Sequence, residues 1–242
     1  MSDTWAKIIT VVTTFVIIFG GWFLFRYYQA QQLSTTPLPG TGGRQGHCVL
    51  WFIGSSSVYR WSSLDADMKP WIAHNRGIEA ATFAELGPRF AHEREKREPE
   101  AIVLYAGEND IARGGTPVKA LADLSAFLDE KVRHFGDLRV FIISMKPSPT
   151  RWANFADQSR FNAEAAAIAR RRPDVTFINI VPLLLVNGRP GNFYQSDGIH
   201  MNPDGYRLWA KAVREALGRT LPARVTRSCD PAFGHLSAAP SR

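Results

Sequence analysis

The sequence predicts an α/β fold: a three-layer α/β/α sandwich with a mostly parallel, doubly wound sheet, preceded by one N-terminal transmembrane helix. Three observations lead to this prediction. Short apolar runs recur along the chain, helical patterns separate them, and polar residues follow directly after several of the runs. Hydrophobic residues make up 45% of the chain of 242 residues, which is enough to build a sizeable core.

The expected strands are short runs that consist almost entirely of apolar residues. Parallel strands buried on both faces have this composition, because neither face meets water. The clear runs are His47–Ile53, Ala101–Ala106, Leu138–Met145 and Val175–Val181, and Trp71–Asn75 is a weaker candidate.

Helical patterns fill the intervals between these strands. Thr116 is a suitable N-cap with Pro117 at the first helical position, and Asn202 and Pro203 repeat the arrangement. The expected helices are Glu79–Arg97, Pro117–Phe135, Gln158–Arg171 and Pro203–Leu217. Alternating strands and helices predict right-handed crossovers, and such sheets carry their active sites at the carboxyl ends of the strands.

The N-terminal segment from Ile8 to Phe25 carries no charge, and Lys7 and Arg26 bracket it. A bilayer core of about 30 Å needs about 20 helical residues, so this span just suffices. A cleaved signal peptide is the alternative, but its apolar core is normally shorter, and Tyr28–Ala30 offers a poor cleavage site. A buried core helix is disfavoured by the charge-free length. We therefore expect an uncleaved membrane anchor.

These patterns divide the chain into an anchor over residues 1–28, a flexible linker over 29–46, a folded domain over 47–220 and a tail over 221–242. The linker is rich in Gln, Ser, Thr, Pro and Gly, a composition typical of flexible tethers. Basic residues are nearly balanced across the anchor, so they leave its orientation open.

The two cysteines, Cys48 and Cys229, lie at opposite edges of the predicted domain. A disulfide between them would tie the chain ends together and would require an oxidising compartment. Two free thiols are the alternative. The cysteine placement favours a domain outside the cytoplasm, in the periplasm or another extracytoplasmic space.

The formal charge of +7 and pI of about 9.7 do not define a binding surface, because the basic residues are scattered. No nucleic-acid motif is present, so no nucleic-acid partner is expected. No H-E-x-x-H motif and no Cys/His cluster with metal spacing occurs in the sequence, so we expect neither a metal nor another cofactor.

Polar blocks follow the expected strands and precede the last helix. Each is weak evidence alone, because glycines after strands are usually turns and Asn-Asp is a common helix cap. Their joint order is the stronger signal. The blocks are Gly54–Ser57, Asn75–Gly77, Gly107–Asp110 and Ser196–His200.

The four blocks resemble those of the SGNH, or GDSL-like, hydrolase superfamily, and the resemblance extends over about Cys48–Leu217. It implies the flavodoxin-like SGNH hydrolase fold and ester chemistry. The family's marker residues Ser, Gly, Asn and His correspond here to Ser56, Gly77, Asn109 and His200.

One block departs from the family pattern. The first block is often Gly-Asp-Ser-Leu, whereas this chain has Gly-Ser-Ser-Ser. Alignment on Gly54 selects Ser56 as the nucleophile and leaves Ser55 as a turn residue and Ser57 as a cap residue. The stretch Ile143–Trp152, ISMKPSPTRW, also resembles a segment of one subgroup, but its Arg and Trp receive no role.

Ester hydrolysis by a serine requires a base beside it and a group that orients the base. A serine hydroxyl is a weak nucleophile until a base accepts its proton, and histidine suits that task. Asp197 lies three residues before His200 and can orient its ring, with Gly198 allowing a tight turn. The resemblance assigns the oxyanion hole to the N–H groups of Ser56 and Gly77 and the side-chain amide of Asn109.

The sequence therefore predicts a membrane-anchored serine esterase that hydrolyses carboxylic esters through an acyl-enzyme. Lipid, acetylated-glycan and small-ester substrates all fit. One alternative is an acyltransferase that uses the same Ser-Asp-His triad with an alcohol acceptor. The other is a catalytically inactive, membrane-tethered binding domain, which the Gly-Ser-Ser-Ser departure suggests.

Overall fold

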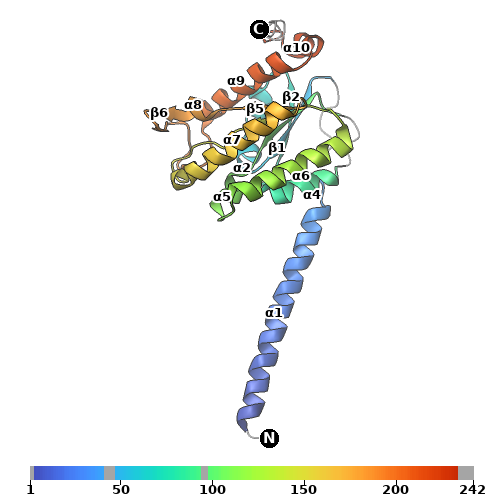
Figure 1. The fold of residues 1–242 in the computed structure, drawn as a ribbon, viewed down its shortest axis with the longest axis vertical. Coiled ribbons are helices and arrows are strands. Elements are labelled where there is room, and N and C mark those ends of the chain that lie inside the picture. The colour runs from blue at the N-terminus through green and yellow to red at the C-terminus, as the bar shows by residue number, and fades with distance from the viewer. Residues whose placement is uncertain (1–2, 41–46, 94–97, 234–242) are drawn as a thin grey trace.

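The structure is a computed structural model that describes residues 3–40, 47–93 and 98–233. A long N-terminal helix leads to a folded domain in which helices lie on both faces of a central sheet (Figure 1). The five strands are parallel and run in the order β2-β1-β3-β4-β5. This order winds outward in both directions from β1, which confirms the expected three-layer, doubly wound architecture.

All five expected strands are present, with small shifts at their ends. β2 has the weakest pattern in the sequence because it lies at one edge of the sheet and half of its residues are only partly buried. A short antiparallel pair, β6 with β7, forms a separate two-stranded sheet. The strands are β1 (Val49–Gly54), β2 (Ile72–Gly77), β3 (Ala101–Tyr105), β4 (Val140–Ile143), β5 (Val175–Ile178), β6 (Leu185–Val186) and β7 (Arg189–Pro190).

The two helices expected to begin with an N-cap residue followed by proline start where the sequence places them. The Thr116 side chain accepts a hydrogen bond from the Lys119 N–H at 3.2 Å, and Asn202 Oδ1 accepts one from Gly205 at 3.0 Å. The helices are α1 (Asp3–Thr35), α2 (Ser56–Tyr59), α3 (Leu64–Asp67), α4 (Phe83–Ala91), α5 (Glu108–Ala112), α6 (Pro117–Phe135), α7 (Phe155–Arg171), α8 (Val181–Leu184), α9 (Pro203–Thr220) and α10 (Ala223–Cys229), with a 3₁₀ turn at Trp152–Asn154.

The core has two halves, one on each face of the sheet. Leu50 and Phe52 of β1 face the half that contains Trp209 of α9. Trp51 and Ile53 face the opposite half, which α4, α6 and α7 complete. Successive strand residues point to opposite faces, so a strand that is buried on both must be apolar throughout.

α4 is shorter than the helix expected over Glu79–Arg97. It begins only at Phe83, because Ala80 has a positive φ of 56° that no α-helix accommodates. Thr82 caps the helix, and its backbone N–H donates to the Glu85 carboxylate at 2.8 Å. The helix ends at Ala91, and residues 94–97 of the expected range lie outside the described residues.

The structure also places elements where the sequence suggested a linker and a tail. α1 continues past residue 28 to Thr35, and Leu38 is only 1% exposed within the core half that contains α4. After residue 220, α10 buries Cys229 against the domain. Residues 41–46 of the expected linker lie outside the described residues. Burial of Leu38 and Cys229 holds these two segments against the domain.

A disulfide joins Cys48 to Cys229, across a sequence separation of 181 residues. Beside it, Asp230 accepts two hydrogen bonds from the Arg214 guanidinium of α9, at 2.6 and 2.8 Å. The C-terminal segment is therefore tied both to the start of β1 and to α9.

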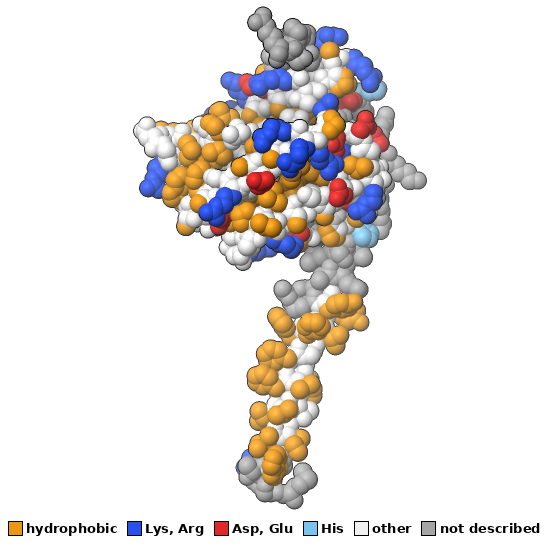
Figure 2. All heavy atoms as spheres, in the orientation of Figure 1, with side chains coloured by type: hydrophobic (Ala, Val, Ile, Leu, Met, Phe, Trp, Pro, Cys, Tyr) orange, Lys and Arg blue, Asp and Glu red, His pale blue; other side chains and the backbone are white. Residues whose placement is uncertain are grey.

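Among the described helices, α1 contains one span that is long and apolar enough to cross a membrane. It covers Lys7–Phe25, with a mean hydropathy of 2.3, and none of it is buried in the structure. Hydrophobic side chains cover this helix in the view of Figure 2. An anchor and a signal sequence share these properties.

Candidate active site

Ser56 lies at the carboxyl end of β1, at the first residue of α2. The chain turns sharply here, and the Ser55 N–H donates to the Tyr105 carbonyl of β3 at 3.0 Å. Gly54 must lack a side chain, because a Cβ would overlap that same carbonyl oxygen. The Ser56 side chain is thereby directed away from the sheet toward the loop before α9.

His200 and Asp197 lie in that loop, which turns at Gly198 with a φ of 64°. Asp197 Oδ1 accepts backbone N–H groups from Ile199 at 2.8 Å and His200 at 2.9 Å. Its second oxygen, Oδ2, lies 2.6 Å from His200 Nδ1. The turn therefore aims the carboxylate at the imidazole ring, as the spacing predicted.

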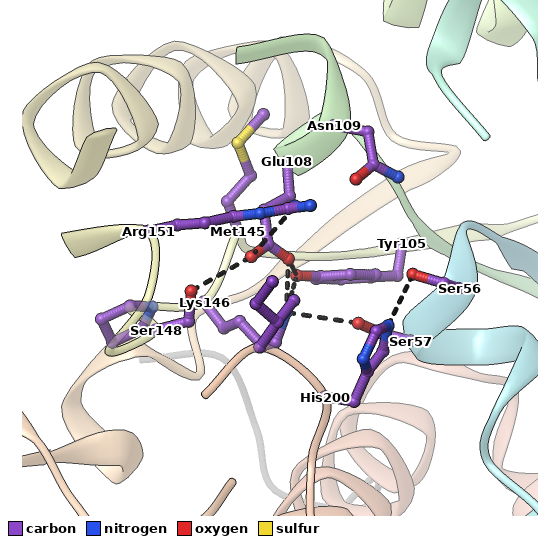
Figure 3. Close-up of polar contacts among 12 residues, drawn as sticks. Ser56, Ser57, Tyr105, Glu108, Asn109, Met145, Lys146, Ser148, Arg151 and His200 are labelled. Carbon is purple, nitrogen blue, oxygen red and sulfur yellow. Dashed lines mark hydrogen bonds and ion pairs between the residues drawn. The ribbon is translucent and has the colours of Figure 1, made fainter. Parts of the chain in front are cut away.

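His200 Nε2 lies 2.9 Å from Ser56 Oγ, and the two side chains point toward each other in Figure 3. An ionised carboxylate can only accept, so the Asp197 contact places a proton on His200 Nδ1. Nε2 is then an acceptor for the serine hydroxyl proton in neutral imidazole. The three residues named from the sequence thus form one hydrogen-bonded chain across segments 144 residues apart in sequence.

The pKa of Asp197 is about 2, below its usual value. Burial raises it, but hydrogen bonds from the His200 side chain and from the backbone N–H groups of Ile199 and His200 lower it further. The carboxylate therefore stays ionised at any pH above about 4.

The three donors expected in the oxyanion hole differ in whether they already have a hydrogen-bond partner. The Ser56 N–H makes no hydrogen bond to the described residues, as a helix N-terminus allows. Asn109 Nδ2 donates to the Ala81 carbonyl at 3.0 Å, which leaves its second amide hydrogen for another acceptor. The Gly77 N–H donates to Asn75 Oδ1 at 3.0 Å, so this bond would have to open before Gly77 could serve an oxyanion. A Cβ at Gly77 would overlap the backbone of Tyr59 in α2.

Arg60 lies at the outer edge of this site. Its Nη1 is 3.9 Å from Asp197 Oδ2 and 3.3 Å from His200 Nδ1, while Glu79 accepts two of its hydrogen bonds. Glu79 raises the pKa of Arg60, so the guanidinium is charged.

A buried polar cluster behind Ser56 was not found from the sequence. Lys146 Nζ contacts Ser57 Oγ at 3.2 Å, the Tyr105 hydroxyl at 3.2 Å and the Glu108 carboxylate (Figure 3). Ser148 and Arg151 complete it at the other oxygen of Glu108. The only indication in the sequence was the stretch ISMKPSPTRW, which contains Lys146, Ser148 and Arg151.

Lys146 and Glu108 are both fully buried, and each changes the titration of the other. Burial lowers the pKa of Lys146, although the Glu108 charge opposes this. Burial alone would raise the pKa of Glu108, but the charges of Lys146 and Arg151 bring it below its usual value. Glu108 is therefore an ionised carboxylate within the core.

The fold and these residues define a class of protein: a serine hydrolase of the SGNH superfamily, acting on ester bonds. A sequence model of the GDSL-like Lipase/Acylhydrolase family matches residues 51–208, and the chain belongs to that family. No curated protein matches the chain.

Solved structures share the fold at low sequence identity. One from Streptococcus pneumonia, whose name refers to a platelet activating factor, is 21% identical, with a TM-score of 0.66 over 85% of this chain and 99% of its own. A GDSL-like lipase from Bacteroides thetaiotaomicron is 20% identical, with a TM-score of 0.59 over 72% of this chain and 89% of its own. A lipolytic G-D-S-L protein from Veillonella parvula is 17% identical, with a TM-score of 0.60 over 71% and 98%.

Proposed function

We propose that this protein hydrolyses carboxylic esters with Ser56 as nucleophile, His200 as general base and Asp197 as the group that orients His200. The observation that carries the proposal is the continuous hydrogen-bonded chain from Asp197 Oδ2 through His200 to Ser56 Oγ, with contacts of 2.6 and 2.9 Å. These distances lie within the reach that proton transfer requires.

The reaction follows from this geometry in two halves. Ser56 Oγ attacks the ester carbonyl while its proton passes to His200 Nε2, and the imidazolium then donates that proton to the departing alcohol. Water attacks the resulting acyl-serine, His200 accepts its proton, and the acid product leaves as Ser56 regains the proton. Asp197 stays ionised throughout and stabilises the imidazolium.

The oxyanion of each tetrahedral intermediate forms beside the start of α2. The Ser56 N–H and the second Asn109 hydrogen have no partner among the described residues, which supports them as its donors. The Gly77 N–H joins them if Asn75 Oδ1 releases it. Losing one such donor commonly costs about 10²–10³ in rate.

Lys7–Phe25 acts in this proposal as a single-pass membrane anchor, with the catalytic domain on the extracytoplasmic side. The span's complete exposure supports an anchor over a core helix. The Cys48–Cys229 disulfide supports an oxidising compartment. Ester substrates near the membrane surface are within reach of a domain held in this way.

The test uses the full chain in a neutral detergent. A fluorophosphonate probe should label Ser56, and Ser56→Ala should lose both the label and the hydrolysis of 4-nitrophenyl acetate. His200→Ala should also lose the label, because the serine then lacks its base. His134→Ala is the matched control, since His134 lies on α6 and contacts Glu130 instead.

Peptide mass spectrometry of the labelled protein decides among the serines. A label on Ser55 or Ser57 would disprove the assignment of Ser56. A folded protein that neither labels nor hydrolyses the ester would point to a binding domain. Transfer of the acetyl group to an added alcohol faster than to water would make the protein an acyltransferase.

A further inference from the structure

The loop that holds Lys146 and Arg151 brings two cations to one carboxylate. Lys146 is fully buried, and Glu108 is the carboxylate within ion-pair distance of it. Arg151 Nη1 lies 3.5 Å from the other oxygen of that same carboxylate. Among the described residues, neither cation has a second acidic partner.

Three other donors already bind the Glu108 carboxylate. Its Oε2 accepts hydrogen bonds from the Tyr105 hydroxyl at 2.6 Å and from Lys146 Nζ, and Ser148 donates to Oε1 at 3.3 Å. A carboxylate has about four acceptor positions, so about one position remains for Arg151. Its long contact with Oε1 agrees with this.

Arg151 therefore has unused hydrogen-bonding capacity. A guanidinium carries five N–H donors, and in the part of the chain that the structure describes the Arg151 side chain donates no hydrogen bond. Its side chain is 20% exposed, unlike that of Lys146, which solvent does not reach. Arg151 is the cation of this cluster that a ligand can contact.

The other charges near the nucleophile are already paired. Asp197 is bound to His200, and Arg60 is bound to Glu79. Asp197 and Glu79 are therefore not available to balance the positive charge of Arg151. Burying or half-burying such a charge is costly without a partner, and a bound anion supplies one.

Arg151 also has the right position. Glu108 and Asn109 are adjacent in α5, and Asn109 is a proposed oxyanion donor. In Figure 3, the Arg151 side chain extends across Glu108 and ends on the side where Asn109 lies. A substrate whose carbonyl oxygen meets Asn109 would present a neighbouring group to Arg151.

We propose that Arg151 binds an oxyanion group, a carboxylate or a phosphate, on the ester substrate, and so selects acidic esters over neutral ones. The proposal rests on the esterase function proposed above. Lys146 supports the site by holding Glu108 in place, which leaves the guanidinium fork of Arg151 for the substrate anion. A planar guanidinium matches both kinds of anion with two parallel hydrogen bonds.

The test compares acidic esters with neutral methyl-ester analogues that keep the same aryl ester bond, and release of the phenol from that bond is followed. The full chain, in neutral detergent, is assayed on 4-nitrophenyl hydrogen succinate and its methyl ester, which place the charge on the acyl side. It is also assayed on 4-acetoxybenzoate, its methyl ester and 4-acetoxyphenyl phosphate, which place the charge on the alcohol side and separate carboxylate from phosphate. KM and kcat are measured for the wild type, Arg151→Gln, Arg151→Lys and Arg160→Gln.

We expect the wild type to prefer a charged ester of at least one pair. Arg151→Gln should lower kcat/KM for that ester about tenfold to a hundredfold more than for its neutral partner, mainly through KM. Arg151→Lys should fall between, because it keeps the charge and loses the fork. Arg160→Gln controls for net charge, since Arg160 is an exposed residue of α7 paired with Asp157.

The outcomes separate this proposal from the esterase function. Equal activity of the wild type on charged and neutral esters would overturn the anion site while leaving the esterase intact. An equal loss on both esters in Arg151→Gln, with the same result in Arg151→Lys, would show a structural role for Arg151 instead. If the wild type hydrolyses none of these esters, the esterase proposal itself is refuted.

Discussion

At the scale of single residues, the Gly-Ser-Ser-Ser block assigns each serine a different environment. Ser55 is buried and its N–H donates to the Tyr105 carbonyl; Ser56 faces His200. Ser57 stands where the resembling family often has leucine, and its hydroxyl contacts Lys146 at 3.2 Å. A leucine could not hydrogen-bond that buried ammonium, so at Ser57 the departure from the family pattern supplies a polar partner to the Lys146–Glu108 cluster.

Asp197→Asn tests the orienting carboxylate. We expect kcat to fall about 10⁴-fold, because an amide favours the wrong tautomer of His200. The carboxylate has a pKa of about 2, so the wild-type activity should not show its protonation at any pH above about 4. Steady-state assays from pH 5 to pH 9, with circular dichroism to verify folding, measure both effects. A variant that keeps a tenth of the wild-type kcat would contradict the assignment.

At the scale of elements, a buried ion pair fastens α6 to the strand beside it. Lys131 of α6 has no exposed side-chain surface, and its Nζ lies 2.6 Å from Asp174 Oδ2, just before β5. The pKa of Asp174 is about 2: burial raises it, while hydrogen bonds from Arg172 and Lys131 lower it further. The ionised carboxylate therefore stabilises the folded state.

Asp174→Asn should lower the free energy of unfolding at pH 7 by about 3–5 kcal/mol, because it leaves Lys131 buried without its charge partner. The lowered pKa sets the pH dependence. The stabilisation is complete above about pH 4, the unfolded value, and is lost as the pH falls through about 2. The difference between variant and wild type should therefore shrink over that interval.

Urea unfolding of both proteins at pH 7 and at several values between pH 4 and pH 2 provides the measurement. The double variant Lys131→Met with Asp174→Asn is the control, since it removes both charges and should cost less than the single variant. An unchanged gap between variant and wild type down to pH 2 would argue against Asp174 as the titrating group.

At the scale of the whole molecule, three contacts join segments near the two ends of the chain to the domain. Leu38 is buried in the core close behind α1, so the domain is held near the proposed anchor and not on a long free tether. At the other end, the disulfide and the Arg214–Asp230 pair hold α10 against the first strand and α9. The active-site loop before α9 lies between these attachments in sequence.

The Cys48–Cys229 bond should contribute about 2–5 kcal/mol to stability, because it closes a long loop in the unfolded chain. Adding a reductant should therefore lower the urea midpoint of the wild type. The variant with both cysteines replaced by alanine should start at the lower midpoint and not respond to the reductant. If the wild type also fails to respond while thiol labelling shows two reactive cysteines, the bond does not form.

The sequence by itself determined the order of elements, the apolar strands, the capped starts of α6 and α9, and the residue types of the candidate triad. These features are local: burial on both faces demands apolar strands, and a helix start demands a cap. Ser56, Asp197 and His200 could be named in advance because the polar blocks that contain them resemble those of the SGNH family, and the structure brings Ser56 and Asp197 within hydrogen-bonding distance of His200.

Only the tertiary structure decided which polar residues became neighbours. Lys146, Glu108 and Ser57 come from three separate segments, and no spacing in the chain reports that they meet. The same holds for the extent of the domain, since Leu38 and Cys229 are drawn in by contacts with distant residues. A buried charge is stable only with its partner in place, and that partner is set by how the whole chain packs.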